Sequence, residues 1–319
     1  MRKNILIILF VAALAGCAAV GSQNPISETR LLLDTVCTVT IYGTRDKTLL
    51  KETLDLCEEY ESMFGMRTEN SDIWRINHAG GIPIEVSPQT AEIIAAGIEY
   101  GRQSGGKFDI TIGRLSALWD FSGNPSVPPA TELSAACETV DYSKISVNGN
   151  VVTMHNPDAW IDLGGIAKGY IAGKLADYLK ERGVMGAVID LGGDVCVLGE
   201  KPDGGLWRVG IRKPNGNKGE LVHIVSTTAA SVVTSGTYER QFTSDGVKYH
   251  HILDPSNGMP SRSDVISATV VTENSIEGDV LSTLIVLTGS ENVQSLLDTH
   301  TGLRSAFLVL ENGECLDLG

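Results

Sequence analysis

The chain has 319 residues, of which 42% are hydrophobic and 20% are charged, and its formal net charge at pH 7 is −14. This is the composition of a globular protein, long enough for one large or two medium domains. The acidic balance argues against nucleic acid as a partner, and an anionic ligand would have to be held by local cations or by a metal ion.

The N-terminus carries the pattern of an export signal. Arg2 and Lys3 precede an apolar run from Ile5 to Leu14, which is too short to span a membrane as a mature helix. The run ends on Leu14-Ala15-Gly16-Cys17, which resembles a bacterial lipobox. The resemblance implies cleavage before Cys17 and attachment of a lipid to that cysteine. The alternative is an ordinary secretory signal with an incidental cysteine.

These signals divide the chain into three parts. We expect a lipoprotein signal peptide at residues 1–17, a tether at 18–29 and a single domain at 30–319. The protein is then extracytoplasmic and anchored to the bacterial cell membrane by the lipid on Cys17. The other five cysteines are scattered, with no C-x-x-C pair and no zinc spacing, so we expect free thiols that mostly pack as small core residues.

Capping residues and periodicity organise the first part of the domain. Residues 31–42 have the composition of a single strand, and apolar residues with helical spacing follow at 46–64. Ser71 is expected to cap a short helix at 72–77. Ser87 followed by Pro88 predicts another helix start, with the helix running to residue 104.

Short helices alternate with strands between residues 108 and 191. Thr131 is expected to cap one of these helices, and Asn148-Gly149 predicts a tight hairpin. The predicted elements are a segment at 108–113, a short helix to 119, a helix after 131, strands at 145–147 and 151–154, a strand at 159–163, a helix from 167 and a strand at 186–191.

The second half of the domain is rich in strands. The expected strands lie at 206–212, 221–226, 230–234, 238–243, 248–253, 265–272 and 304–310, and the expected helices at 277–288 and 291–299. Hairpins mixed with helices predict an α+β fold with mixed, largely antiparallel sheets flanked by helices.

One stretch combines a turn with candidate binding residues. The predicted strand at 159–163 leads through Gly164-Gly165 into a helix, and such a turn presents free backbone amides at the positive end of a helix dipole. Asp162 can orient a polar ligand or a metal there, and Lys168 can reach a phosphate. The alternative is an ordinary tight turn with a surface lysine.

Two further clusters carry chemical groups. His250 and His251 end a predicted strand before a Pro/Asn/Gly turn, and a histidine can accept or donate a proton near neutral pH. Asp279 and Thr283 are four residues apart on a predicted helix, so a carboxylate and a hydroxyl face the same way toward a hard cation. The alternatives are a packing histidine, a capping aspartate and a threonine bonded to its own backbone.

The order of these clusters resembles the ApbE family of flavin transferases, over about residues 31–310. The segments that carry the resemblance are Ser71-Asp-Ile-Trp-Arg-Ile-Asn77, Phe108-Asp-Ile-Thr-Ile-Gly113 with Leu118-Trp119, Asp162-Leu-Gly-Gly-Ile-Ala-Lys-Gly169, Gly192-Gly-Asp194, Ser235-Gly-Thr-Tyr-Glu-Arg240, His251-Ile-Leu-Asp-Pro-Ser-Asn-Gly258 and Asp279-Val-Leu-Ser-Thr283. It implies a two-lobed flavin transferase domain.

The resemblance also implies roles for individual residues. His251 is the expected catalytic residue, favoured over His250 by the Ile-Leu-Asp-Pro register that follows it. A magnesium ion is expected on Asp279, Thr283 and the backbone carbonyl of Gly165. The expected FAD-binding residues are Met66, Asn77, Phe108, Asp109, Ile110, Asp162, Lys168, His251 and Ile252. The match is loose near Met66 and near Leu33.

The implied reaction moves FMN from FAD to a Ser or Thr hydroxyl of another protein, with release of AMP. Magnesium neutralises the pyrophosphate in an acidic protein, and His251 takes the hydroxyl proton, so the rate is expected to rise with pH through the histidine titration. The family's acceptor motif, Asp-Gly-x-Ser/Thr-Gly-Ala-Thr, is absent from this chain. The expected acceptor is therefore a separate protein, an exported subunit of a membrane redox complex.

Two other functions compete with this one. A magnesium-dependent FAD pyrophosphatase would use water in place of the hydroxyl and give FMN and AMP, and a residue near Asn77 can bias that choice. A flavin-binding lipoprotein without activity is the third, although His251, Asp279 and Thr283 are all present. Mn²⁺ or Ca²⁺ can replace Mg²⁺ at a site of oxygen ligands.

Overall fold

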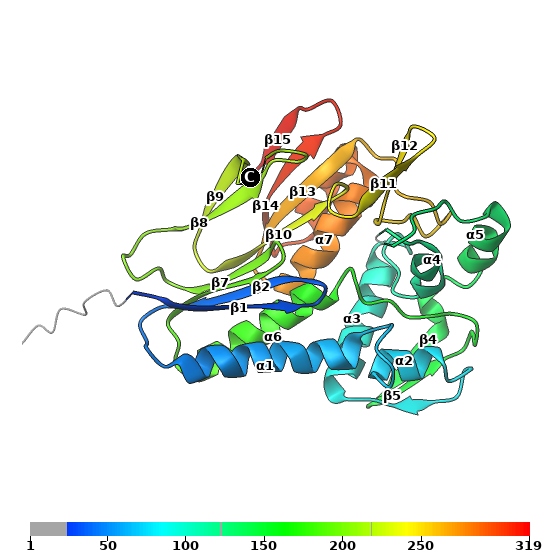
Figure 1. Ribbon diagram of the computed structural model, residues 1–319, viewed down its shortest axis with the longest axis horizontal. Coiled ribbons are helices and arrows are strands. Elements are labelled where there is room, and N and C mark those ends of the chain that lie inside the picture. Colours follow the sequence, from blue (N-terminus) through cyan, green and yellow to red (C-terminus); the bar gives the residue numbers. More distant parts are fainter. Residues whose placement is uncertain (1–23, 122, 218) are drawn as a thin grey trace, which may run out of the picture.

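Eight strands form the central sheet of the computed structural model, which describes residues 24–121, 123–217 and 219–319 (Figure 1). Every strand pair in the described part of the chain is antiparallel, which confirms the predicted α+β class. In spatial order the strands are β1 (Ile26–Leu32), β2 (Thr35–Ile41), β6 (Gly186–Leu191), β7 (Asp194–Gly199), β10 (Ala230–Gly236), β13 (Val265–Thr272), β14 (Leu303–Leu310) and β15 (Cys315–Leu318).

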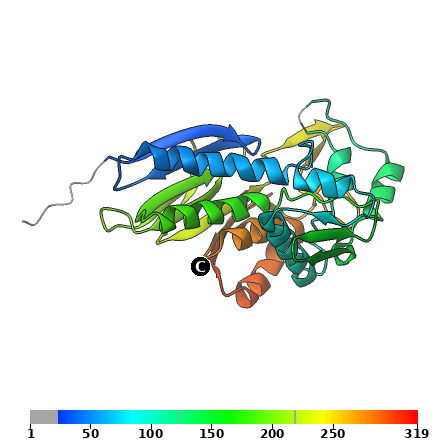
Figure 2. The same ribbon diagram turned by 90° about the horizontal axis from the view of Figure 1, so that it is seen from below.

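One face of this sheet is covered by three helices, α1 (Lys47–Phe64), α6 (Ala167–Glu181) and α7 (Ser275–Thr288). Figure 2 shows α1 and α6 side by side beneath the strands. The apolar stripes of the helices face the sheet, and α7 is buried along most of its length. This layer holds the main hydrophobic core and fixes α6 against α7.

The opposite face carries a hairpin of β8 (Trp207–Arg212) and β9 (Leu221–Thr227). Ile211 from this hairpin packs on Val232, Val271 and Phe307 in a smaller core. Strand β10 therefore contributes to both faces: Val232 faces the hairpin and Val233 faces the helices. This is the period-2 alternation of a strand buried on both sides.

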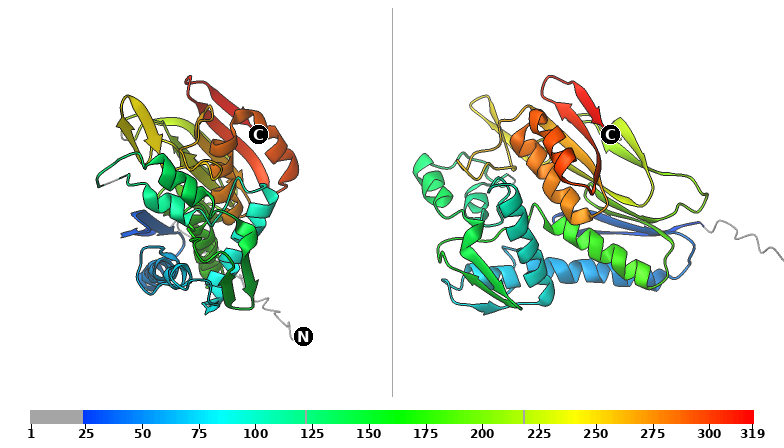
Figure 3. Two further views of the ribbon diagram at one scale, coloured as in Figure 1. Left: turned by 90° about the vertical axis from the view of Figure 1, so that its right-hand side faces the viewer. Right: turned by 180° about the vertical axis from the view of Figure 1, so that it is seen from behind.

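A second lobe lies at the end of α1 and α6 (Figures 1 and 3). Its helices are α2 (Asp72–Asn77), α3 (Pro88–Gln103), α4 (Gly113–Leu118) and α5 (Ala130–Cys137), and its small sheet is β3 (Ile84–Glu85), β5 (Val151–Met154) and β4 (Ile145–Asn148). The remaining elements are η1 (Tyr142–Lys144), β11 (Gln241–Ser244), β12 (Val247–His250), η2 (Ser290–Asn292) and α8 (Val293–Thr299).

Two of the three predicted helix caps, Ser71 and Ser87, are confirmed. Asp46, Ser71 and Ser87 each accept a hydrogen bond from a backbone amide of the first turn, so α1, α2 and α3 begin where their sequences indicate. Thr131 was the wrong cap, because α5 begins at Ala130 after Pro129. Proline restricts the backbone before the helix, and the Pro129 carbonyl accepts from the amides of Glu132 and Leu133.

The expected strand at 31–42 is a hairpin instead. Leu33 and Asp34 have φ values of 55° and 56°, which allow a two-residue turn between β1 and β2. Leucine is uncommon in that conformation, so no turn was predicted here. Strand β1 begins at Ile26, so residues 26–29, expected in the tether, belong to the sheet.

The predicted strand at 159–163 was also wrong. This segment is extended, but its β-pairing is limited to one isolated parallel bridge between Ile112 and Trp160. Its backbone is held instead by the Asn77 side chain and by a bond from the Asp162 amide to the carbonyl of Ile110. An apolar run predicts burial, whereas a strand also needs a neighbouring strand.

The N-terminal predictions concern residues outside the described part. The signal peptide and the Leu14-Ala15-Gly16-Cys17 sequence lie before residue 24. In the described ranges, no helix has both the length and the apolar character needed to cross a membrane. The five described cysteines are free thiols.

Candidate functional site

Asn77 fixes the extended segment before the Gly164-Gly165 turn to the second lobe. Its Nδ2 donates to the carbonyl of Ile161 at 2.9 Å, and its Oδ1 accepts from the Ile161 amide at 2.7 Å. Both ends of the buried side chain are thus used on one residue of the extended segment. Asn77, which the resemblance placed in the FAD site, acts here as a clamp on the extended segment that leads into the turn.

Asp162 shapes the turn itself. One carboxylate oxygen accepts from the Gly164 amide at 2.8 Å, and the other accepts from the Ser116 hydroxyl at 2.6 Å. The first bond uses one of the backbone amides that the Gly-Gly turn would otherwise present to an anion. Gly165 lies against the Phe108 ring, whose Cε2 would be 3.1 Å from a Cβ at position 165.

The start of α6 touches α7 through a glycine. The Gly169 amide donates to Asp279 Oδ2 at 2.9 Å. A Cβ at position 169 would collide with the carbonyl oxygen of Ser275 and lie 2.7 Å from the Cβ of Asp279, so only glycine allows this approach. The approach brings Lys168, one residue earlier, to the same carboxylate.

Lys168 lies between two buried aspartates. Its ammonium contacts Asp194 Oδ2 closely and lies 3.6 Å from Asp279 Oδ1. The side chains of Asp194 and Asp279 are 2% and 3% exposed. Burial raises the pKa of Asp194 to about 7, against the opposing effect of Lys168. Burial alone would lower the pKa of Lys168, but the two carboxylates outweigh it and raise that pKa.

A network of hydroxyls continues from Asp279 along α7. Ser235 on β10 has its Oγ 3.1 Å from Thr283 Oγ1 and 2.8 Å from Ser282 Oγ. Ser282 is fully buried and also donates to the carbonyl of Asp279 at 3.1 Å. These bonds orient the Thr283 hydroxyl one turn along the helix from Asp279.

These donors suit a hard cation. A carboxylate, a hydroxyl and a carbonyl are the oxygen ligands that Mg²⁺ prefers, and the buried carboxylate Asp279 needs a positive partner. The described residues contain no group of three or more His, Cys, Asp or Glu side chains with metal-binding geometry. A cation on Asp279 and Thr283 would therefore rely on backbone or substrate oxygens for its other ligands.

The two neighbouring histidines differ in their hydrogen bonds. His250 is buried, its Nε2 lies 3.0 Å from the carbonyl oxygen of Ser261, and its Nδ1 accepts from the Ile252 amide at 3.3 Å. His251 has a buried Nδ1 without a hydrogen-bond partner. Burial, with smaller contributions from Arg240 and other cations nearby, lowers the pKa of His251 to about 4. His251 is therefore the neutral imidazole with bonding capacity to spare.

His251 borders an aromatic cluster through Phe121. The Phe121 ring meets the imidazole edge-on, with 6.5 Å between ring centroids. Phe121 stacks on Trp119 at 5.7 Å and contacts Phe242 at 5.8 Å, so the second lobe and the β11–β12 hairpin join here. This apolar surrounding accounts for the low pKa, since it disfavours a charged ring.

The other predicted FAD residues lie around the same junction. Phe108 and Ile110 are buried in the main core, Ile252 is buried, and Met66 packs against that core while half-buried. Both oxygens of Asp109 are used: one accepts from the amide and hydroxyl of Thr111 and the other from the Tyr142 amide. The Asp109 side chain is thus an internal brace, and burial raises its pKa.

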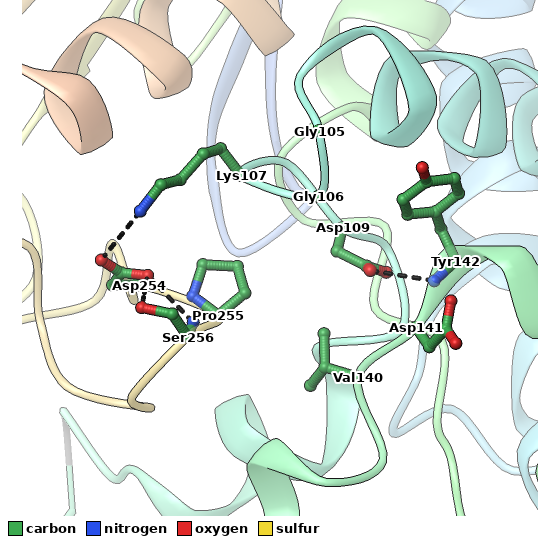
Figure 4. A pocket seen from close by; sticks show the side chains of 10 residues that line it. All are labelled: Gly105, Gly106, Lys107, Asp109, Val140, Asp141, Tyr142, Asp254, Pro255 and Ser256. Atoms are coloured by element: carbon green, nitrogen blue, oxygen red, sulfur yellow. Dashed lines mark hydrogen bonds and ion pairs between the residues drawn. The ribbon is translucent and has the colours of Figure 1, made fainter.

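A cavity of about 250 Å³ opens beside this brace (Figure 4). It lies between Lys107 and Asp254, which form an ion pair at 3.4 Å, and the Asp141–Tyr142 segment. Asp254 is three residues after His251 and Lys107 precedes Phe108. The cavity therefore borders the two segments that carry predicted site residues without reaching Lys168 or Asp279.

Two site residues were missed by sequence reasoning. Asp194 and Ser235 stand in segments that carry the family resemblance, yet neither had been placed in the site. Asp194 reaches Lys168 because β7 turns back beside β6, and Ser235 reaches Thr283 because α7 packs on β10. A Gly-Gly-Asp sequence after a strand was the available signal for Asp194, since loops positioned by a rigid scaffold often carry functional residues.

Comparison with known proteins identifies the family. The sequence profile described as the ApbE family matches residues 33–307. The chain belongs to the ApbE family. An FAD:protein FMN transferase of Klebsiella pneumoniae (strain 342) is 34% identical over 82% of this chain and 83% of its own length. One of Treponema pallidum (strain Nichols) is 29% identical over 95% and 89%.

Solved ApbE structures share the fold. The ApbE protein of Thermotoga maritima superposes with a TM-score of 0.84 at 30% identity, covering 92% of this chain and 97% of its own. The flavin transferase ApbE of Vibrio cholerae gives a TM-score of 0.82 at 27% identity, covering 93% and 97%. The ApbE-like, two-lobed α+β architecture expected from the sequence is thereby confirmed.

Proposed function

We propose that this chain is an FAD:protein FMN transferase, which moves FMN from FAD to a hydroxyl of an acceptor protein and releases AMP. The observation that carries the proposal is the pairing of two features in an ApbE family fold. One is a half-buried Lys168 between two buried aspartates, and the other is the neutral His251 with an unused ring nitrogen. The relatives named above bear this activity in their names.

The proposed metal is Mg²⁺, held by Asp279, Thr283 and the backbone carbonyl of Gly165. When bound, it neutralises the charge of the pyrophosphate and polarises the bond to be cut. Asp279 and Thr283 supply a carboxylate and a hydroxyl from successive turns of α7, and Ser235 orients the hydroxyl. Mn²⁺ or Ca²⁺ can take the same oxygen ligands.

Protein residues position the substrate in this proposal. Lys168 provides the positive charge for the FAD phosphates, and Asp162 with the Gly164-Gly165 turn shapes the surface that the phosphates approach. Phe108, Ile110, Met66 and Ile252 supply apolar contacts. Asp109 and Asn77 contribute indirectly: their internal hydrogen bonds fix the backbone of the segments on either side.

His251 acts as the general base. A neutral imidazole can accept the proton of a Ser or Thr hydroxyl as that oxygen attacks the phosphorus, and AMP then leaves on the opposite side. The burial that lowers its pKa keeps the ring in the accepting form at neutral pH. The acceptor is another protein with the motif Asp-Gly-x-Ser/Thr-Gly-Ala-Thr, since this chain lacks it.

One assay separates the three candidate functions. The purified protein is incubated with FAD and Mg²⁺, with and without an acceptor that carries the motif, while protein-bound flavin fluorescence and AMP are followed. A transferase gives fluorescent acceptor and AMP in equal amounts and little AMP without acceptor. AMP formed equally well without acceptor would identify an FAD pyrophosphatase. Bound FAD that stays intact would identify a flavin-binding lipoprotein.

The proposed location is the outer side of the bacterial cell membrane, with a lipid on Cys17. The basis is the Leu14-Ala15-Gly16-Cys17 sequence behind a basic start and an apolar run. Cys17→Ser is expected to release the protein from the membrane or leave it as an unprocessed precursor. Metabolic labelling with a fatty acid tests this, because normal labelling of Cys17→Ser would exclude lipid attachment at that residue.

A further inference from the structure

Lys168 and a cation would compete for the same carboxylate oxygen. Asp279 Oδ2 already accepts the Gly169 amide at 2.9 Å, and Oδ1 faces the Lys168 ammonium at 3.6 Å. Oδ1 is thus the oxygen with capacity for a cation. An ammonium drawn fully onto Oδ1 would occupy that oxygen and add positive charge beside it, which disfavours a second cation.

Asp194 draws the ammonium away from this oxygen. Lys168 Nζ lies much closer to Asp194 Oδ2 than to Asp279 Oδ1. The Asp194 side chain is almost fully buried, so water screens the attraction little. Of the two aspartates, Asp194 therefore holds the lysine, and Oδ1 of Asp279 keeps the capacity to bind another ligand.

The backbone makes Asp194 a fixed anchor. It starts β7 directly after Gly192 and Gly193, whose φ values are 71° and 102°, and it pairs with Val233 of β10 in the centre of the sheet. The Gly193 amide also donates to Asp190 Oδ1 at 2.9 Å. The backbone of Asp194 cannot shift toward α7 without disturbing the pairing of β7 with β10.

We propose that Asp194 is a positioning residue that holds the Lys168 ammonium off Asp279 and thereby sets the affinity of the Asp279 site for a divalent cation. The inference rests on the cation site proposed above. Without the Asp194 charge, Asp279 becomes the remaining anionic partner of the ammonium, and the lysine moves onto Oδ1. Changes to groups that support a metal ligand typically weaken metal affinity by about 10–100-fold.

Direct cation binding tests this without any catalysis. Mn²⁺ is titrated into the purified full-length protein at pH 8, where the Asp194 carboxylate is ionised even with its raised pKa, and free Mn²⁺ is counted by electron paramagnetic resonance. Asp194→Asn is expected to raise the Mn²⁺ dissociation constant at least tenfold, and Asp194→Glu, which keeps the charge, much less. Mg²⁺ added as competitor should displace the bound Mn²⁺.

A double variant separates competition from structural damage. Asp194→Asn with Lys168→Gln removes both the anchor and the competitor, so Mn²⁺ affinity should return to the wild-type value or become tighter. A variant that only loosened the fold would stay weak in the double combination. Asp190→Asn is the matched control: it removes the same charge from the same hairpin, where the carboxylate accepts the Gly193 amide.

Four results would contradict these proposals in distinguishable ways. Wild-type affinity in Asp194→Asn at pH 8, or weakness that persists fully in the double variant, would overturn the role of Asp194 alone. An equal loss in Asp190→Asn would show a general charge effect and would also overturn it. Absence of saturable Mn²⁺ binding to the wild-type protein would overturn the cation site itself.

Discussion

The two halves of the candidate site manage buried polar groups in opposite ways. On the sheet lobe, Lys168, Asp194 and Asp279 are charged groups that compensate one another at short range. At the junction of the lobes, His251 lies against the Phe121 ring and its buried Nδ1 has no hydrogen-bond partner. The Lys168 cluster therefore keeps its charges, whereas His251 is held in its neutral form.

This difference suits a division of labour. A cluster of fixed charges can hold a phosphate and a cation, because its opposite charges already compensate one another and need little rearrangement. An apolar setting keeps an imidazole neutral and ready to accept a proton. The comparison predicts that changes on the charged side act on cation and FAD binding, whereas changes at His251 act on the chemical step.

The largest expected effect is that of His251→Ala. A general base contributes typically ~10²–10⁴-fold in rate, so FMN transfer at saturating FAD should fall by roughly that factor. His250→Ala is the neighbouring control and should lose much less transfer, although it should lower stability because both of its ring nitrogens are in hydrogen bonds. A larger loss of transfer in His250→Ala than in His251→Ala would show that His251 is not the general base.

Asp279→Ala is expected to reduce transfer by about 100-fold at a fixed Mg²⁺ concentration, since it removes the charged ligand. Thr283→Ala, one helix turn away, should do less harm because it removes a neutral ligand. A Mg²⁺ titration of the transfer rate distinguishes the two halves: the half-saturating concentration should rise in Asp279→Ala and stay unchanged in His251→Ala. An unchanged half-saturation in Asp279→Ala would exclude it as a ligand.

Asn77→Ala should lower the free energy of unfolding by about 1–3 kcal/mol, because the buried amide and carbonyl of Ile161 lose their partners. Asn292→Ala is the control, since its side chain makes one exposed bond to the Thr288 carbonyl. Urea unfolding measures both. Equal stability of the two variants would mean that Asn77 does not hold the segment at Ile161. In a separate assay, the ratio of AMP to transferred FMN would show whether Asn77 biases the reaction toward FAD hydrolysis.

The smallest expected effect is that of pH. Burial lowers the pKa of His251 to about 4, so the ring is neutral above that value and only the neutral ring accepts a proton. At saturating Mg²⁺ the transfer rate should therefore be nearly flat from about pH 6 to pH 8 and fall about tenfold per unit below the pKa. This places the titration lower than the sequence alone indicated. A steep rise between pH 6 and pH 7 would mean that His251 is solvated and not enclosed by Phe121.

Local signals predicted much of the fold. The caps at Ser71 and Ser87 and the hairpin at Asn148-Gly149 were correct because each depends on residues close in sequence. The Leu33-Asp34 turn was missed, since neither residue marks a left-handed turn strongly. The segment at 159–163 was assigned to a strand because periodicity reports burial and cannot show that Asn77, far away in sequence, takes the place of a neighbouring strand.

The same limit applied to the site. Asp279 and Thr283 could be paired from helical spacing alone, and the structure places both on α7 as expected. Asp194 could not be joined to Lys168 in that way, because the contact depends on how β7 returns beside α6. The difference between His250 and His251 likewise required the carbonyl of Ser261, which the chain brings back eleven residues later.

The binding of FAD to His251→Ala tests the division of labour most directly. Flavin fluorescence measures the FAD dissociation constant of the wild-type and variant proteins in the presence of Mg²⁺. If Lys168 and the cation site hold the phosphates while His251 serves the chemical step, the two constants should agree within about twofold while transfer falls by at least ~10²-fold. A dissociation constant that rises in proportion to the loss of transfer would show that His251 contributes binding energy and would contradict the account.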